Sequence, residues 1–355
     1  MQNDKMMNGM SLFSSAGIAE MYFEKIGINI KYSNEIDPIR SRFFKSLYPK
    51  TEVITGDIQK DEIKYNLIEK AKGLDFLIAT PPCQGFSTLG VTKKTDNLQF
   101  DKRNFLIFDV LEIIEKSDFK YVLIENVPRF LNLFYPINNE FKNIEEILNF
   151  ALGNKYNIKV DIFDASDYGV PQFRKRAIIR IFKKGLEWGE PQKFEKITLR
   201  QSIGHLPSLE AGEKSDIKWH YAKIHNNRDI LAMQHTPEGK SALLNAVNYP
   251  KKENGDRISG FHNTYKRMRW DEPAKARTTN CGNIGSHNNV HPGNRNDDGT
   301  YSDSRVLTLL ETFIVSSIPP NTKFPEFASD ALIRKMIGEA IPPRLCMEIL
   351  KPIII

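Results

Sequence analysis

The sequence has little of what marks a secreted, membrane-bound or metal-binding protein. Only three cysteines occur in 355 residues, Cys83, Cys281 and Cys346, too few and too widely spaced for a disulfide framework or a zinc cluster. No apolar run reaches the roughly 20 residues that a membrane-spanning helix needs. Residues 1–10 lack the apolar segment of a secretory signal. We therefore expect a cytoplasmic protein with no metal site and no membrane contact.

The net positive charge is small and unevenly distributed along the chain. The formal net charge is +6 at pH 7. Residues 191–300 hold 17 Lys and Arg against 12 Asp and Glu, so this segment supplies +5 of the total, and all seven histidines lie in it. A basic segment of this kind suits contact with a polyanion. A solvated loop region with ordinary surface charge explains the composition equally well.

Short apolar runs alternate with helical patterns through the first 185 residues. We expect strands at residues 9–13, 29–33, 52–54, 75–79 and 120–124, and helices at 18–26, 38–47, 105–114 and 144–152. Two further strands, 156–163 and 176–182, follow without an intervening helix, as in an antiparallel hairpin. This order predicts an α/β fold: a doubly wound, mostly parallel sheet with an antiparallel terminal hairpin.

The pattern weakens from about residue 185. Residues 280–296 hold six Asn and three Gly, which is typical of loops. Periodicity returns at 305–314 and 330–350. We therefore predict an α/β domain at 1–185, a smaller irregular domain at 186–304, and C-terminal helices at 305–355, the last returning to the first domain.

The sharpest local feature is PPCQGFS at residues 81–87, directly after an expected strand. Ligands of open parallel sheets bind at the carboxyl ends of the strands. A cysteine held there on a proline-stiffened turn is placed as a nucleophile, provided that its surroundings favour the thiolate. Most lone cysteines are small buried hydrophobes instead, but the flanking residues favour the nucleophile.

Two further motifs carry charged side chains to strand ends. ENV at 125–127 puts Glu125 after the next strand, where an acid can hydrogen-bond or protonate a ring nitrogen while a thiolate adds to carbon. QFRKR at 172–176 begins the hairpin's second strand, and alternation places Arg174 and Arg176 on one face. Guanidinium groups there suit anionic or carbonyl oxygens. A loop-capping carboxylate and a basic edge strand are the simpler interpretations of the two motifs taken singly.

A nucleoside site is suggested more weakly. Residues 12–17 form a strand-to-helix turn of small residues with a single glycine, and Glu35 follows about 20 positions later. A carboxylate at that spacing can bind ribose hydroxyls. Asp57 adds an acid after the third strand.

In this order, PPCQGFS, ENV and QFRKR resemble the DNA (cytosine-5) methyltransferases. RVLTLLE at 305–311 and GEAIPP at 338–343 also resemble segments of that family. The resemblance covers nearly the whole chain apart from the irregular segment. It implies a class I S-adenosylmethionine-dependent methyltransferase sheet and a target-recognition region.

The resemblance also implies roles for single residues. Cys83 would attack C6 of cytosine, Glu125 would contact N3 and the exocyclic amine, and Arg174 and Arg176 would support the cysteine loop and the cytosine O2. The residues implied for the S-adenosylmethionine site are Phe13, Ala16, Gly17, Ile18, Glu35, Ile36, Asp57, Ile58, Pro82, Glu339 and Ala340.

Two departures from the family pattern concern the cofactor site. Ser15 and Ile18 stand where the family usually has glycine, and Glu339 stands where it usually has asparagine. The last change brings an extra negative charge toward a cationic sulfonium.

Chemistry at C5 of cytosine requires the base to be rotated out of the duplex, at a cost of a few kcal/mol. Contacts with DNA must offset this cost. Residues 265–270 interleave cations with aromatic side chains, and Asn and Arg can contact base edges. The residues we expect at DNA are Gln84, Ser87, Lys266, Arg267 and Arg269, although a solvated loop remains the simpler interpretation for each one in the irregular segment.

The leading hypothesis is a monomeric bacterial DNA cytosine-5 methyltransferase, acting on duplex DNA in a restriction–modification system beside a cognate endonuclease. An RNA enzyme resembling the tRNA-aspartate methyltransferase of this family is the main alternative, but the long segment between QFRKR and RVLT favours duplex DNA. A dinucleotide-dependent oxidoreductase lacks its G-x-G-x-x-G motif. A catalytically silent DNA-binding relative is disfavoured because every reactive position is filled.

Overall fold

The computed structural model describes residues 6–83, 101–137 and 139–354, and the chain forms two compact units. The first unit comprises Met1–Asp164, Lys175–Gln192 and Cys346–Ile355, and the second comprises Ala165–Arg174 and Lys193–Leu345. The units differ from the domain limits expected from the sequence. Residues 165–174 and 305–345 belong with the irregular segment, and only the end of the chain returns to the sheet.

The first unit is built on a seven-stranded sheet of order β3-β2-β1-β4-β5-β9-β8. Its strands are β1 (Met7–Leu12), β2 (Ile28–Glu35), β3 (Glu52–Thr55), β4 (Phe76–Ala79), β5 (Tyr121–Asn126), β8 (Tyr156–Asp164) and β9 (Lys175–Lys183). The first five are parallel, whereas β9 pairs antiparallel with both β5 and β8. The doubly wound sheet with a terminal antiparallel hairpin is confirmed.

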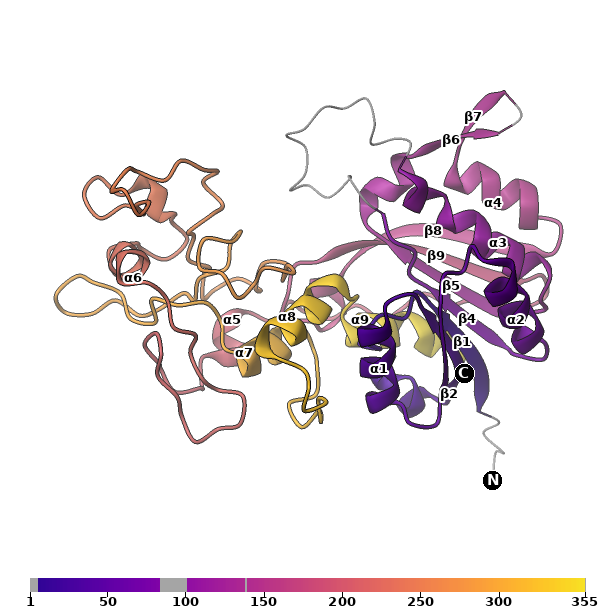
Figure 1. Cartoon of the computed structure of the whole chain (residues 1–355), viewed down its shortest axis with the longest axis horizontal. Helices are drawn as coiled ribbons and strands as arrows, with labels where there is room; N and C mark the ends of the chain where they lie inside the picture. Colours follow the sequence, from indigo (N-terminus) through magenta and orange to yellow (C-terminus); the bar gives the residue numbers. More distant parts are fainter. Residues whose placement is uncertain (1–5, 84–100, 138, 355) are drawn as a thin grey trace. The chain divides into compact units, whose positions relative to one another are not determined.

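Helices cover both faces of this sheet (Figure 1). Figure 1 shows α2 (Asp61–Ala71), α3 (Leu106–Glu115) and α4 (Ile144–Leu152) on one face, and α1 (Pro38–Leu47) and α9 (Pro343–Leu350) on the other. Ile124 of β5 packs in the core under the first group. Because side chains alternate along a strand, Glu125 points to the opposite face.

Local sequence explains where the helices begin. Asp37 caps α1 by accepting from the backbone N of Ile39, and Pro38 occupies the first turn, where its missing N–H costs nothing. Asn143 and Glu146 form a capping box at α4. The predictions of helices at 38–47 and 144–152 are therefore confirmed to the residue.

Other element predictions were wrong in detail. The helix expected at 18–26 is a pair of short 3₁₀ turns, η1 (Ala19–Tyr22) and η2 (Glu24–Ile26). The helix expected at 330–350 is two, α8 (Asp330–Glu339) and α9, because the Pro342–Pro343 pair interrupts it. A small hairpin of β6 (Phe134–Ile137) and β7 (Glu140–Asn143) was not foreseen.

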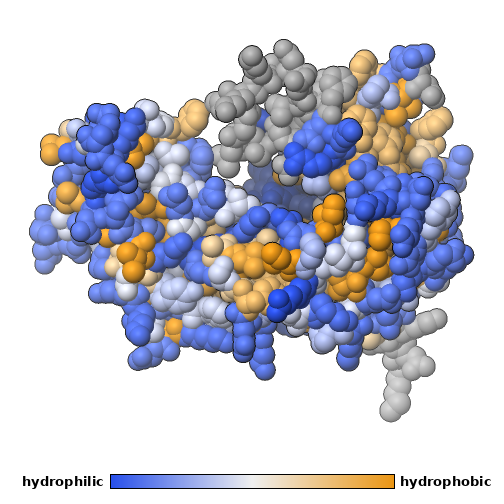
Figure 2. All heavy atoms as spheres, viewed as in Figure 1, coloured by the Kyte–Doolittle hydropathy of each residue, from blue (hydrophilic) through white to orange (hydrophobic). Residues whose placement is uncertain are grey.

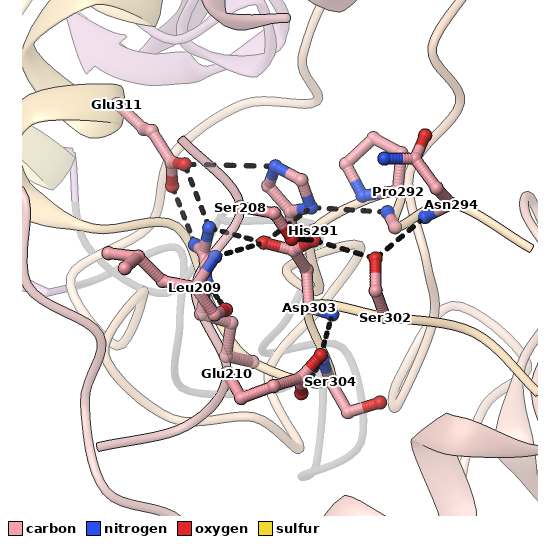
Figure 3. A network of polar contacts seen from close by, with 12 residues as sticks. Ser208, Leu209, Glu210, His291, Pro292, Asn294, Ser302, Asp303, Ser304 and Glu311 are labelled. Atoms are coloured by element: carbon pink, nitrogen blue, oxygen red, sulfur yellow. Dashed lines mark hydrogen bonds and ion pairs between the residues drawn. The ribbon is translucent and has the colours of Figure 1, made fainter. Parts of the chain in front are cut away.

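Loops dominate the second unit, and its other helices are α5 (Leu199–Ile203), α6 (Asn227–Gln234) and α7 (Leu309–Val315). A buried ion network holds these loops together (Figure 3). Arg305 is completely buried and donates to Asp303 Oδ1 at 2.7 Å and to Glu311 Oε2 at 2.8 Å. Burial, the largest single effect, opposes ionisation of Glu311, but the charges of Arg305 and His291 and the hydrogen bonds from Arg305 and the Thr308 amide together outweigh it and lower the pKa of Glu311 to about 2. Burial lowers the pKa of His291, beside both carboxylates, to about 4.

The face seen in Figure 2 is mostly hydrophilic, with apolar side chains in separate groups between the polar ones. Within the described ranges, no helix combines the length and the apolar character needed to cross a membrane.

Candidate active site

The parallel strands of the first unit bring most of the predicted site residues to one edge. Phe13 follows β1, Glu35 ends β2, and Asp57 follows β3. Cys83 follows β4, and Glu125 lies at the end of β5, which is hydrogen-bonded to β4. The carboxyl ends of these strands lie together because their neighbours run parallel, and this is the edge where open α/β sheets bind ligands.

The cysteine turn is anchored on both sides. Asn126 Nδ2 donates to the carbonyl of Pro81 at 3.0 Å, which ties the turn to β5. Thr80 Oγ1 donates to the carbonyl of Phe13 at 3.0 Å, which ties it to the turn after β1. Both hydrogen bonds end on backbone carbonyls, so they fix the path of the chain that carries the sulfur. Pro82, half-buried, stiffens the same turn.

Cys83 itself is half-buried and packs against the core. Burial, and to a smaller extent the charge of Asp101, raises the pKa of its thiol to about 11. The protein alone therefore keeps this sulfur almost entirely as the protonated thiol at neutral pH. A nucleophilic role requires a bound substrate to change the surroundings in favour of the thiolate.

Glu125 and Arg176 form a close ion pair. Arg176 Nε lies 2.6 Å from Glu125 Oε1, and the two side chains are 12% and 9% exposed. The sheet brings the two side chains together, because Glu125 lies on β5 and Arg176 on its antiparallel neighbour β9. A carboxylate oriented by a guanidinium at the strand end beside the cysteine turn can hold the edge of a small heterocycle.

Arg174 does not share this environment. β9 begins at Lys175, so the alternation that we expected to place Arg174 and Arg176 on one face of a strand does not extend to Arg174. Its side chain is 4% exposed and donates to the carbonyls of Arg277 and Gly338, both at 2.8 Å. Both partners belong to the second unit.

The turn after β1 has the shape and the polar groups of a cofactor cradle. Phe13, Ser15 and Gly17 have φ of 57°, 47° and 76°, so the chain bends sharply. A Cβ on Gly17 would lie 2.4 Å from the Tyr48 ring, whose hydroxyl donates to the Gly17 carbonyl at 2.6 Å. The single glycine of this turn is therefore indispensable, whereas Ser15 takes the left-handed conformation without one.

The carboxylate of Glu35 holds this turn in place. One oxygen of its carboxylate accepts from the amide of Ser15 at 2.9 Å, and the other accepts from the amide of Asp37 at 2.9 Å. Carboxylate oxygens have further lone pairs, so these bonds leave room for a ribose hydroxyl. Ile36, beside it, is 62% exposed, which is unusual for isoleucine and suits a planar ring lying over it. These residues fit a nucleoside-bearing cofactor.

The other residues predicted to bind the cofactor differ in their exposure. Ala16, Ile18 and Ile58 are buried, and the side chain of Ile58 belongs to the hydrophobic core. Asp57 is half-exposed. Glu339 and Ala340 lie at the end of α8 in the second unit, where both are half-buried.

The predicted DNA contacts need one clear correction. Arg267 is completely buried, and its guanidinium donates to carbonyls such as those of Met233 and His291 at 3.0 and 2.9 Å. It is a structural arginine and cannot reach DNA. Lys266 is half-buried, and Arg269 has 47% of its side chain exposed. Gln84 and Ser87 lie outside the described residues.

Sequence reasoning missed two residues of the site. Asn126 anchors the cysteine turn, and its place within the ENV triplet could have signalled a role. Asp101, whose charge bears on Cys83, lies 18 positions further along the chain, and no motif marks it.

Comparisons with known proteins decide the family. The model of the C-5 cytosine-specific DNA methylase family matches residues 7–354. The chain belongs to this family. It is thus a DNA (cytosine-5) methyltransferase, and the resemblance seen in PPCQGFS, ENV and QFRKR is confirmed.

Individual relatives agree with this family. The chain is 45% identical over 98% of its length to the Type II methyltransferase M1.HgaI of Avibacterium volantium, of which it covers 98%. It is 30% identical over 97% of its length to the Type II methyltransferase M.NgoPII of Neisseria gonorrhoeae, covering 94% of that protein. The solved structure of the Entamoeba histolytica methyltransferase EhMeth has the same fold, with a TM-score of 0.65 at 16% identity and 98% coverage of both chains.

Proposed function

We propose that this methyltransferase transfers a methyl group from S-adenosylmethionine to C5 of a cytosine rotated out of a specific duplex sequence. The observation that carries the proposal is the Glu125–Arg176 pair beside the anchored turn of Cys83. A nucleophile and an acid on adjacent strand ends suit attack on one atom of a ring while another atom is protonated.

In the proposed reaction, the Cys83 thiol loses its proton when the cytosine is bound, and the sulfur bonds to C6. The electron pair of the C5–C6 double bond then becomes available at C5, while the Glu125 carboxylate takes up the proton that the thiol releases and passes it to N3. S-adenosylmethionine, when bound, supplies an electrophilic methyl group. After methyl transfer, a base removes the proton from C5, the electron pair of that C–H bond restores the C5–C6 double bond, and the sulfur–C6 bond breaks. The departing thiolate regains its proton as N3 returns one through Glu125.

Residues of the first unit would hold the methyl donor. The sharp turn at 13–17 and the carboxylate of Glu35 suit its nucleoside group, and Ile36 offers a flat apolar contact. Pro82 would line the same site. The family resemblance implies that Glu339 and Ala340 also contact the methyl donor.

The second unit would contact duplex DNA. Its loops expose uncharged polar side chains, among them Thr279, Asn280 and Asn283, of the kind that hydrogen-bond base edges. Lys266 and Arg269 would contact phosphates.

We also infer the biological setting. Relatives named as type II methyltransferases support a role in restriction–modification, with a cognate endonuclease as the functional partner. The enzyme would act as a monomer in the bacterial cytosol, where the nucleoid lies. Cleavage by that endonuclease should be blocked on plasmid DNA that the pure enzyme has methylated.

The deciding experiment is methyl transfer in parallel to duplex DNA and to tRNA, followed by sequencing of the modified cytosines. We expect modification of DNA at one short sequence. Cys83→Ser should lose turnover by at least about 10³-fold while still binding DNA, as removal of a nucleophile does, and Cys281→Ser serves as the matched control. DNA bearing 5-fluorocytosine should become trapped on the wild-type enzyme and not on Cys83→Ser. Methylation of tRNA alone would overturn the proposal and favour the RNA alternative.

A further inference from the structure

A pocket lies in the first unit at the end of the sheet opposite to Cys83. Its walls come from the start of β5, the segment 187–192 and the end of the chain, all within the first unit, and its volume is about 620 Å³. This volume is typical of sites for small molecules. Tyr121 begins β5 and Glu125 follows four residues later, so the two lie about 13 Å apart along the strand. The pocket is therefore separate from the candidate active site.

The walls of this pocket are fixed to one another. Trp188 is 1% exposed, and its Nε1 donates to the Ile349 carbonyl of α9 at 2.9 Å. Gly189 lies so close to the end of the chain that a Cβ on this glycine would stand 3.2 Å from Pro352 Cβ. The segment 187–192 and the end of the chain therefore form one continuous surface, on the face of the sheet that α9 covers (Figure 1).

Tyr121 lines the pocket with a hydroxyl that has no partner. The residue is 8% exposed, and its ring packs edge-on against Trp188 with the centroids 5.6 Å apart. Within residues 6–83, 101–137 and 139–354, nothing is hydrogen-bonded to the hydroxyl, although buried polar groups usually have such a partner. Burial raises the pKa of Tyr121, so the phenol stays neutral and can both donate and accept. It is therefore placed to bind a ligand in the pocket.

Two carboxylates of the lining are already held by basic side chains. Glu348 is 2% exposed, and both of its oxygens accept from Lys351 Nζ, at 2.7 and 2.8 Å. Glu190 accepts from Lys159 and Arg180, at 3.0 and 3.1 Å. Carboxylate oxygens have further lone pairs, so both groups can still accept from a ligand, but they bring little uncompensated charge.

Glu187 supplies the uncompensated charge. It is exposed, and in the described part of the chain no basic side chain is paired with it. Among the described lining residues, the carboxylates of Glu187, Glu190 and Glu348 stand against one ammonium, that of Lys351, so hydrogen-bond acceptors outnumber donors. A lining of this kind disfavours phosphates and suits a cation that carries several N–H groups.

The acidic groups are spread along the pocket. No group of three or more His, Cys, Asp or Glu side chains among the described residues is arranged to hold a metal ion. Pro352 and Ile353 add apolar surface to the same lining. Ammonium groups joined by methylene chains match this pattern, because the methylenes can pack on the apolar surface while the ammonium groups reach the carboxylates.

We propose that this pocket binds a linear aliphatic polyamine, with one ammonium group at Glu187 and a second N–H group between the Tyr121 hydroxyl and the Glu348 carboxylate. The ligand bridges the segment 187–192 and the end of the chain. It therefore stabilises the folded first unit, as any ligand does that binds the folded protein alone. Because the site lies at the other end of β5 from Glu125, the ligand leaves the candidate active site open.

Equilibrium dialysis of the full chain against radiolabelled spermidine, in the absence of DNA, measures binding directly. We expect about one spermidine per chain at about 0.1 M salt, with an affinity that falls as salt is added. Glu187→Gln removes the charge and Tyr121→Phe removes the hydroxyl, and each should weaken binding by about 5-fold or more. The matched controls are Glu145→Gln on α4 and Tyr65→Phe on α2, both exposed residues of the same unit, which should bind as the wild type does.

Thermal unfolding gives a second readout. Saturating spermidine should raise the Tm of the wild type by about 2 °C or more, because a ligand of the folded state shifts the unfolding equilibrium. The rise should be less than half as large in Glu187→Gln, whose exposed position leaves the fold intact. Octanediol, which has the methylenes without the charge, and inorganic phosphate should leave the Tm unchanged.

Absence of spermidine binding would overturn the inference. Equal binding by the wild type, Glu187→Gln and Tyr121→Phe would overturn it as well, because that result is expected of nonspecific attraction to surface carboxylates. Binding of phosphate or octanediol without binding of spermidine would refute the choice of an organic cation. Methyl transfer plays no part in these measurements, so their outcome is independent of the proposed function.

Discussion

The buried position of Cys83 makes a quantitative prediction about the free enzyme. Its pKa is raised from 9.0 to about 11 by burial and by Asp101. At pH 8, a thiol with a pKa of 9.0 is about one-tenth thiolate, whereas a thiol with a pKa of 11 is about one-thousandth thiolate. The more basic thiolate is also the stronger nucleophile, by about tenfold over this range of pKa. Alkylation of Cys83 at pH 8 should therefore be about 10-fold slower than that of an ordinary thiol.

Iodoacetamide labelling followed by mass spectrometry of the peptide that contains Cys83 measures this rate. We expect the rate to rise about tenfold per pH unit up to pH 10 without a plateau. Asp101→Asn should raise the rate at every pH below 10, because the variant removes a negative charge that disfavours the thiolate. Cys281 and Cys346, 1% and 0% exposed, are internal controls that should stay unlabelled while the protein is folded. A plateau at or below pH 9 would show that the free enzyme already holds an activated cysteine and would refute the reasoning.

Three further predictions concern the site and the buried network. Asn126→Ala removes the hydrogen bond to the Pro81 carbonyl and should lower kcat by about 10-fold or more with little change in the affinity for DNA; an unchanged kcat in steady-state assays would show that the turn needs no anchor. Glu125→Gln should lower kcat by about 10²–10⁴-fold, the usual contribution of a general acid, and a pH–rate profile that keeps the wild-type shape and height would exclude Glu125 from proton transfer. The pKa of His291 is lowered from 6.5 to about 4, so the neutral form is favoured in the folded protein; stability is then complete above pH 6.5 and falls by about 3 kcal/mol as the pH drops to 4. Thermal unfolding of wild type and His291→Asn over this range should show a smaller acid loss in the variant, and identical slopes would contradict the assignment.

The strands and the first site residues could be predicted from the sequence because their causes are local. Apolar runs such as that of β4 and caps such as Asp37 act within a few residues. Cys83 and Glu125 follow consecutive strands, and the prediction that they meet needed only that these strands be neighbours, as β4 and β5 are. Motifs at strand ends therefore predicted both the fold and the residues that do the chemistry.

The structure of the second unit could not be predicted in this way, because its stability comes from polar contacts between residues far apart in the sequence. Arg267 sits in a run of cations and aromatics that is typical of a nucleic-acid surface, yet its partners are carbonyls of residues 24 to 36 positions away and the hydroxyl of Ser304, 37 positions away. Arg174 likewise finds its partners 103 and 164 positions along the chain. Nothing in the local pattern distinguishes an arginine that satisfies buried carbonyls from one that binds phosphate. The Pro342–Pro343 pair, by contrast, was a visible break signal that the periodicity of 330–350 obscured.

The second unit is discontinuous in sequence, since it takes in Ala165–Arg174 as well as Lys193–Leu345. Target specificity could be exchanged between this enzyme and a relative by transplanting one contiguous segment of the second unit. Such a graft would separate Gln172 from its hydrogen-bond partners, the Val315 carbonyl and the Arg277 amide. A functional chimera should therefore need two grafts, the ten residues between β8 and β9 and the longer segment. A single graft should leave the transplanted segment without these hydrogen bonds and poorly packed.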